Sequence, residues 1–179
     1  MKLKGLLLSL MATAVLFTGC GSNGENTDKE NNAGEGTDVV TSASVATDAE
    51  SLKTAIGQEG TWIAIVQQDL AVEDELVIEG EVAKTEGGEY EGRKLALYNQ
   101  DENRNITDSY TLTAPKVTVK ADKTLLKGGV IVGDLYVEAK DVTLDHMKIE
   151  GNVYFANEEV KTSFTLTESE VTGNQEVQQ

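Results

Sequence analysis

The chain has 179 residues, which is enough for one domain of ordinary size. It carries 31 acidic residues against 15 basic ones, so its net charge is −16 at pH 7. A surface of this sign repels the phosphates of nucleic acids and anionic lipids, and we expect no nucleic-acid partner. The acids are scattered rather than clustered, which favours a solvated exterior over a cation-binding surface.

An export signal occupies the first twenty residues. Two lysines stand in Met1–Lys4, Gly5–Phe17 is apolar, and the small residues Thr18 and Gly19 precede Cys20. A basic start, an apolar segment and small residues before a cleavage site are typical of a secretory signal peptide. The apolar segment has 13 residues, whereas a transmembrane helix needs roughly 20.

Cys20 is the only cysteine of the chain. Its place at the end of the signal resembles a bacterial lipoprotein signal, although Phe17 stands where that family has an aliphatic residue. The resemblance implies that residues 1–19 are removed and that Cys20 is acylated, palmitate included. The protein would then be anchored by lipid to the extracytoplasmic face of the cell membrane. A secretory signal without a lipid is the alternative.

Residues 20–46 are expected to form a tether. From Gly21 to Asp38 the only apolar residue is Ala33. Such a segment buries too little surface to offset the entropy lost on ordering, so we expect it to be disordered. The folded domain is therefore expected to occupy residues 47–179.

A short helix opens the predicted domain. Thr47 and Glu50 have the spacing of a capping box, and Gly57 stands where a helix would stop. Three apolar residues between them fall on one helical face, which predicts an amphipathic helix of about three turns. The face that this helix would bury consists of Leu52, Ala55 and Ile56.

Short strands are expected downstream of the helix. Residues 62–66 read as the first strand, and no further helical periodicity appears after it. Gly87-Gly88 could turn a local hairpin between Val82 and Leu95, as a side excursion or as part of a coil. The polar segment Asn99–Ser109 is expected to be a loop.

Internal repeats indicate the architecture. Residues 141–152 align with 163–174 at an offset of 22, and residues 133–137 align with 151–155 at an offset of 18. Residues 117–119 read as an earlier copy of the triplet that begins at Val142. Offsets of this size suit the coils of a parallel β-solenoid, whose coils stack about 4.8 Å apart. An antiparallel sandwich would call for Asn-Gly or Asp-Gly turns, and residues 110–175 contain none.

The order of these segments resembles a known family. A short helix, Gly60-Thr61, an apolar strand, Asp69–Val72 and then Leu76–Gly80 are similar to the entry of a right-handed parallel β-helix of the pectate-lyase-like type. The later Gly-Asp and Gly-Asn steps are similar to bactofilin-type β-helices, which polymerise end to end. The resemblance implies an all-β fold, a right-handed parallel β-helix with a short N-terminal capping helix.

Enzymes of this fold cleave polysaccharides, but their motifs are missing. The lyase motif centred on arginine and proline has no counterpart around Pro115, Arg93 or Arg104, and the single histidine, His146, is not in a Gly-His-Gly motif. Three acids could approach one another across a coil, although acids at coil corners are more often turn residues. These acids are Asp134, Asp141 and Asp145. We therefore predict no catalytic residue, no metal site and no cofactor.

Alternation along the repeats predicts which side chains face outward. Tyr136 and Tyr154 should lie outside on consecutive coils and form a flat aromatic shelf for a neutral sugar ring, or a pair that merely covers the sheet. Leu144 and Leu166 should stack inside. A row of threonines should dress an exposed face, and two cross-coil charge pairs should lie at the surface. The row is Thr118, Thr143 and Thr165, and the pairs are His146 with Glu168 and Lys148 with Glu170.

The function favoured by these features is that of a non-catalytic, membrane-anchored lipoprotein. It would present a rigid β-helix surface to envelope or extracellular polysaccharide, or to a protein partner, with Tyr136 and Tyr154 as the ligand-binding residues. A structural, self-assembling module is the first alternative, and a polysaccharide-active lyase or hydrolase is the second.

Overall fold

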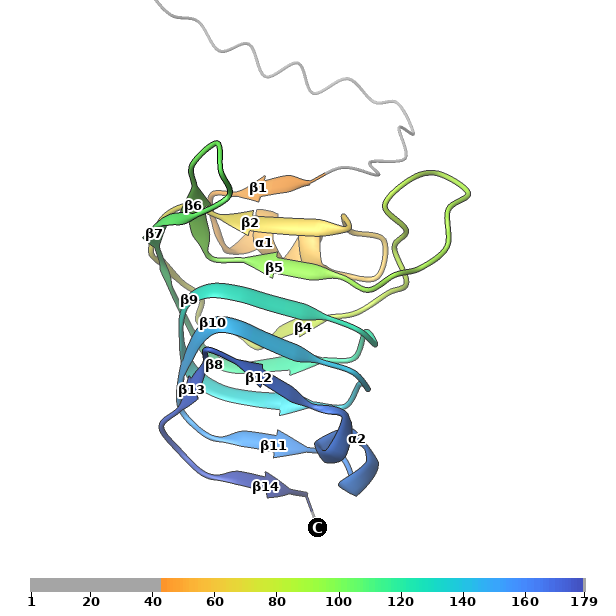
Figure 1. Ribbon diagram of the computed structural model, residues 1–179, viewed down its shortest axis with the longest axis vertical. Coiled ribbons are helices and arrows are strands. Elements are labelled where there is room, and N and C mark those ends of the chain that lie inside the picture. The colour runs from red at the N-terminus through yellow and green to blue at the C-terminus, as the bar shows by residue number, and fades with distance from the viewer. Residues whose placement is uncertain (1–42, 179) are drawn as a thin grey trace, which may run out of the picture. The chain divides into compact units, whose positions relative to one another are not determined.

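The computed structural model describes residues 43–178 (Figure 1). The predicted signal peptide 1–19, Cys20 and most of the predicted tether lie outside the described residues. The described part consists mainly of strands and includes two short helices, neither of which is long and apolar enough to cross a membrane. In chain order the elements are β1 (Ser44–Ala46), α1 (Ala49–Ile56), β2 (Ile63–Val66), β3 (Leu70–Ala71), β4 (Leu76–Ile78), β5 (Lys94–Ala96), β6 (Tyr98–Gln100), β7 (Ile106–Ser109), β8 (Thr111–Val119), β9 (Leu125–Val137), β10 (Thr143–Glu150), β11 (Val153–Phe155), α2 (Glu158–Ser163), β12 (Thr165–Thr167), β13 (Glu170–Val171) and β14 (Gln175–Val177).

The main sheet is parallel, and its strands pair in three series. The first series runs through β1, β2, β5, the start of β9, the start of β10 and β12. The second runs through β3, the start of β8, the middle of β9, the end of β10 and β13. The third runs through β4, the end of β8, the end of β9, β11 and β14. A pass is the stretch of chain that contributes one strand segment to each of these three series in turn.

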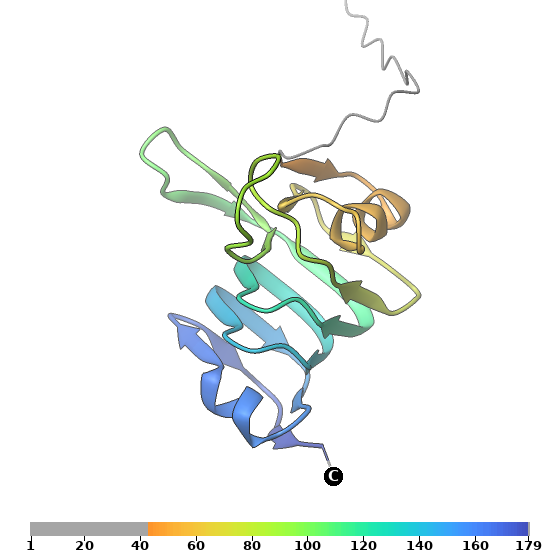
Figure 2. The same ribbon diagram turned by 90° about the vertical axis from the view of Figure 1, so that its right-hand side faces the viewer.

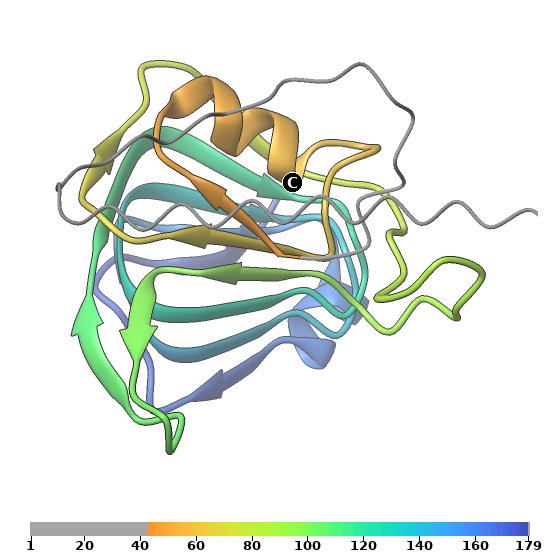
Figure 3. The ribbon, with the colours of Figure 1, turned by 90° about the horizontal axis from the view of Figure 1, so that it is seen from above.

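The predicted strand-rich, parallel architecture with an N-terminal helix is confirmed. Viewed from above, successive passes curl around a common interior (Figure 3). Alternate side chains of each segment point into this interior, as the period of two in a strand requires. Together with Leu52 of α1 and with Leu97, which lies between β5 and β6, the largest fully buried side chains are Phe155, Leu76, Ile78, Leu95, Leu112, Leu126, Ile131, Leu135, Leu144 and Ile149.

Two of the three predicted repeat registers are confirmed. Leu144 pairs with Leu166 at the offset of 22, and Tyr136 pairs with Tyr154 at the offset of 18. The third register is wrong, because Thr118 pairs with Tyr136 in the third series whereas Thr143 belongs to the first series. An apolar-Thr-apolar triplet fits any strand buried on one face, so the pattern alone could not assign the series.

The threonine row is therefore shorter than expected. Thr143 pairs with Thr165 as predicted. Thr118 is 1% exposed, and its hydroxyl donates a 2.6 Å hydrogen bond to Glu75 Oε1. A threonine that is buried and bonded in this way does not dress an exposed face.

Helix α1 begins one residue later than the predicted capping box. Asp48 is the N-cap, and its Oδ1 accepts a 2.8 Å hydrogen bond from the Ser51 backbone N–H, while Ser51 Oγ accepts one from the Asp48 N–H. Serine thus fills the N3 role that the sequence assigned to Glu50. The helix ends at Gly57, and the predicted face of Leu52, Ala55 and Ile56 is buried.

The folded part begins before the predicted boundary at Thr47. Strand β1 lies within the expected tether and pairs in parallel with β2. Ala46 is 1% exposed and belongs to the core, which explains why this short segment is ordered. A strand of three residues is too short for its alternation to stand out in a sequence.

The side chain of Arg93 joins α1 to the sheet. Its Nη1 donates to the carbonyl oxygens of Ile56 (2.9 Å), Gly57 (2.7 Å) and Glu79, and its Nη2 donates to those of Ala55 (2.6 Å) and Thr61 (2.8 Å). Arg93 is 3% exposed. Three of its acceptors are carbonyls at the C-terminal end of α1, where the helix dipole also favours a cation, and each of the three accepts a backbone N–H as well.

Two excursions leave the sheet at its corners. The segment Asn99–Ser109, expected as a loop, belongs to the antiparallel hairpin of β6 and β7, with an irregularity between Asn99 and Gln100. It is the only antiparallel pair within residues 43–178. The hairpin expected around Gly87-Gly88 does not form: the chain between β4 and β5 contains no strand. Tyr98, at the base of the hairpin, packs against Gly128, which has φ +67° and leaves no room for a Cβ.

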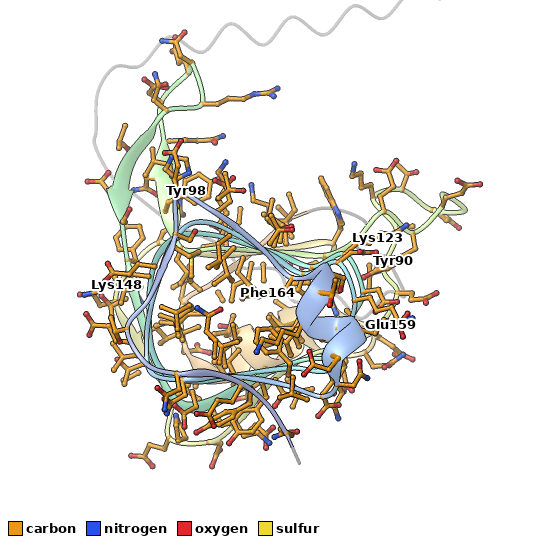
Figure 4. The ribbon with its side chains drawn as sticks, turned by 60° about the horizontal axis from the view of Figure 1, so that its bottom comes forward. Tyr90, Tyr98, Lys123, Lys148, Glu159 and Phe164 are labelled. Carbon is orange, nitrogen blue, oxygen red and sulfur yellow. The ribbon has the colours of Figure 1, made fainter. Side chains whose placement is uncertain are left out.

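The last pass contains a helix that the sequence did not predict. Helix α2 has Asn157 as its N-cap and buries Val160. Phe164 follows it and packs edge-to-face on Phe155 at 5.1 Å, and Figure 4 shows Phe164 beside α2. Leu144 and Leu166 stack in register, but Leu166 is 41% exposed because no further strand of the described residues pairs with β12. The predicted stacking of Leu166 on Leu144 is therefore confirmed, but Leu166 is not buried.

Candidate binding surface

Tyr136 and Tyr154 occupy the outer side of the third series, as predicted. Tyr136 stands between the buried Leu135 and Val137, and Tyr154 stands between two equally buried neighbours. Alternation along a strand therefore turns both rings away from the core. Each tyrosine is half-buried.

The two rings do not form the flat shelf that the sequence predicted. Their centroids are 4.8 Å apart and their planes are tilted by 35°. This is a tilted contact, intermediate between a parallel stack and an edge-to-face pair. Strand spacing is too small for two phenol rings to lie side by side in one plane.

Lys116 lies on the other side of Tyr136. Its Nζ is 4.5 Å from the centroid of the Tyr136 ring and 3.0 Å from Glu75 Oε1. The hydrogen bond from Thr118, and then that from Lys116, hold the pKa of Glu75 below its usual range, so this carboxylate is charged at neutral pH. Lys116 and Tyr154 thus flank the ring of Tyr136 and leave little of its faces free for a ligand.

Tyr154 is the more available ring of the pair. Its register partner on the next pass is Glu176, which is exposed and not aromatic. Partial desolvation, followed by the negative charge of Asp134, raises the pKa of the Tyr154 hydroxyl. The hydroxyl is therefore protonated at neutral pH and can both donate and accept a hydrogen bond. An aromatic face beside such a hydroxyl suits a neutral sugar.

The three acids that could have approached one another serve separate local roles. Asp134 Oδ1 accepts a 2.8 Å hydrogen bond from the Asn152 N–H, and Asp145 accepts one of 2.6 Å from Lys127. Asp141 lies at a corner with φ +57°. Among residues 43–178, no three His, Cys, Asp or Glu side chains are grouped as metal ligands.

A chain of charged groups joins the last passes on the outer face. His146 Nδ1 lies 2.5 Å from Asp145, and its Nε2 lies 2.8 Å from Glu168, as the alignment of these two positions predicted. Lys148 aligns with Glu170 in the register but makes its 2.5 Å ion pair with Glu150. Of these contacts, that between His146 and Glu168 bridges neighbouring passes, whereas the other two lie within β10. All of these side chains except that of Asp145 are well exposed.

Two grooves were not anticipated from the sequence. One, of about 580 Å³, lies between the first series and the hairpin, and its lining combines aliphatic, amide and tyrosine side chains with the charged Lys94 and Asp108. Outward-facing Ile63 and Ile65 form part of it, opposite Asn99 and Gln100. The other, of about 980 Å³, lies beside α1. Neither groove could be predicted without knowing where the two excursions fold back. The alternation of the first strand does, however, place Ile63 and Ile65 on its solvent-facing side, and outward aliphatic residues are a signal of such a groove.

Comparison of the chain with models of protein families, with curated proteins and with solved structures gave no match.

Proposed function

We propose that this protein is a non-catalytic lipoprotein, anchored through Cys20 to the extracytoplasmic face of the cell membrane, which binds neutral envelope or extracellular polysaccharide. The observation that carries the proposal is the outward stack of Tyr136 and Tyr154 with its free side at Tyr154. The signal-like first twenty residues support the location, and the acidic surface favours neutral glycans over uronates, which it would repel.

We further propose that the curled parallel sheet is a right-handed parallel β-helix. Three parallel series with pass-to-pass offsets of 18 and 22 support this assignment, because a solenoid repeats one chain segment per coil. Helix α1 fits the role of a cap, since it buries one face against the first strands and leaves the other in solvent. A rigid solenoid holds the two tyrosines at a fixed spacing, which is what pre-organised binding requires.

The binding proposal is tested by substituting each ring separately. Tyr154→Ala should abolish retention of the full-length protein on immobilised neutral polysaccharide. Tyr136→Ala should weaken retention less, because Lys116 already covers that ring. Both rings are half-exposed, so each variant should lower the thermal midpoint by only a few degrees. Tyr110→Ala, which removes a half-buried ring of the hairpin, is the matched control.

Retention that survives Tyr154→Ala, or that Tyr110→Ala reduces equally, would contradict the site. The anchor is tested separately with Cys20→Ser. This change should move the protein from the detergent phase to the aqueous phase or leave it uncleaved, and unchanged partitioning would contradict the lipid.

A second candidate function is self-assembly, and the exposed edge of the last pass favours it. Strands β12, β13 and β14 each pair on one side only within the described residues, and Leu166 of β12 is 41% exposed. Strand edges without a partner can pair with further strands, and an exposed apolar side chain beside them adds surface for the new strands to bury. Filaments or closed assemblies that disappear in the Leu166→Lys variant would support this role in place of glycan binding.

A further inference from the structure

The larger groove lies between α1 and the segment that links β4 to β5. Its walls are α1 with the turn 58–61 on one side and residues 81–87 on the other, and Ser44 and Val45 of β1 form part of its lining. Its volume is about 980 Å³. Figure 2 shows this helix and this link at the same end of the sheet.

The charges that line this groove all have one sign. No lysine, arginine or histidine is part of the lining. None of its carboxylates takes part in an ion pair within residues 43–178, whereas the nearby Asp74 and Glu91 are paired with lysines. Each of the groove's acids is exposed, and one of them also caps α1. They are Asp48, Glu50, Glu59, Glu81 and Glu86.

Apolar surface accompanies these charges. Val45 is 52% exposed, and Val45 and Leu166 are the large hydrophobic residues most exposed to solvent among those described. Val82 and Ala83 add half-buried apolar surface to the opposite wall. A groove with an apolar strip and unpaired carboxylates fits an occupant that is apolar on one side and cationic on the other.

A free strand edge borders the same groove. Strand β1 ends the first series and pairs with β2 alone among the described residues. An edge strand offers its unpaired N–H and C=O groups to a further strand. An added strand shows alternate side chains on opposite faces, so one strand can present both kinds of side chain.

We propose that this end of the protein binds an extended basic segment of another protein, which adds as a strand beside β1. Aliphatic side chains of the segment cover Val45, and its lysines or arginines lie over the carboxylates of the groove. The partner is a polypeptide, because a neutral glycan would offer no positive charge to these carboxylates and an anionic membrane would be repelled by them. The proposal uses neither tyrosine of the binding surface and stands independently of glycan binding.

The test measures binding of a fluorescent peptide of alternating lysine and valine to the full-length protein in nonionic detergent. Binding should weaken as salt is added, because exposed charges are screened. The triple change Glu50→Gln, Glu59→Gln and Glu81→Gln should weaken it about tenfold. The control triple Glu73→Gln, Glu102→Gln and Glu138→Gln removes the same charge at exposed sites outside the groove and should change affinity by less than about twofold.

Two further measurements separate strand addition from simple charge attraction. Val45→Ser should weaken binding about fivefold with an unchanged thermal midpoint. The same peptide with alternate backbone nitrogens methylated should not bind, because it cannot pair along one edge. Failure of the unmodified peptide to bind, equal weakening by the two triple variants, or undiminished binding of the methylated peptide would each overturn the proposal. Loss of glycan retention in the tyrosine variants has no bearing on it.

Discussion

Replacing Arg93 with methionine should destabilise the fold, although Arg93 forms no ion pair within residues 43–178. Methionine keeps most of the apolar stem but removes the guanidinium that donates to five backbone carbonyls. Burial lowers the pKa of Arg93, but an arginine stays charged at neutral pH. The carbonyl dipoles stabilise this charge, and the nearby charge of Glu79 adds to the effect.

The size of the effect follows from the carbonyls that remain. The carbonyls of Ala55 and Ile56 keep a donor in the variant, because they also accept the backbone N–H groups of Thr61 and Glu79. The carbonyl of the buried Thr61 loses its donor, which costs about 1–3 kcal/mol. The bonds that the guanidinium makes to the other two buried carbonyls add a loss of about 1 kcal/mol each. The folded variant regains part of this loss, because it no longer has to desolvate a guanidinium. We therefore expect a net loss of about 2 kcal/mol in the free energy of unfolding, which lowers the thermal midpoint by roughly 6 °C.

Urea titration followed by the fluorescence of Trp62 measures this loss, since the single tryptophan adjoins Thr61, whose carbonyl oxygen accepts a hydrogen bond from Arg93. Arg93→Lys should fall between the parent and the methionine variant, because an ammonium cannot reach all the carbonyls. Arg104→Met, at an exposed position of the hairpin, is the control and should change stability by less than about 0.5 kcal/mol. A methionine variant at position 93 that is as stable as the control would refute the reasoning.

Three other variants probe separate features. Leu144→Ala should cost about 2–5 kcal/mol and Leu166→Ala under about 1 kcal/mol, and equal losses in denaturant titrations would contradict the difference in burial between the two residues. Burial acts to raise the pKa of Asp145, but hydrogen bonds from its lysine and histidine partners outweigh it and hold the pKa below its usual range. Its contribution is thus complete above the pKa of the unfolded chain and is lost as pH falls through the lower folded pKa. The difference in stability between the parent and Asp145→Asn should therefore shrink on acidification. A difference that grows would contradict the lowered pKa of Asp145. Gly128→Ala places a Cβ 2.6 Å from the ring of Tyr98, whereas Gly87→Ala, at a similar φ of +70°, meets nothing within 4 Å. Both variants lose about 1 kcal/mol to backbone strain, so the additional loss at 128, seen in thermal melts, measures the clash, and equal melts would exclude it.

Much of the fold could be predicted because its repeats leave a trace in the sequence. Positions such as Leu144 and Leu166, or Tyr136 and Tyr154, carry similar residues at fixed offsets, and these offsets are the registers of the parallel pairs. Helix α1 could be predicted because its cap and apolar face are local signals. The outward direction of the tyrosines followed from alternation alone.

The features that were missed depend on contacts between distant segments. Helix α2 has six residues and only one buried side chain, Val160, so it has no periodicity to detect. The hairpin of β6 and β7 is polar, and its position depends on Tyr98 packing over Gly128. The stacking of the two tyrosines required the spacing of the strands as well as their direction. The acidic groove combines residues from three separate parts of the chain.

The uneven spacing of the passes has a consequence for how the chain folds. Between β9 and β10 the paired residues are 18 apart, and between β10 and β12 they are 22 apart. Residues 63 and 94 also pair, with the link from β4 to β5 between them, and residues 76 and 117 pair with both excursions between them. Closing a longer loop costs more chain entropy before any contact forms. We expect the segment from β8 to β14 to form the folding nucleus, and the N-terminal strands with α1 to join it afterwards. For an exported chain this order is the reverse of the order in which its residues emerge from the membrane.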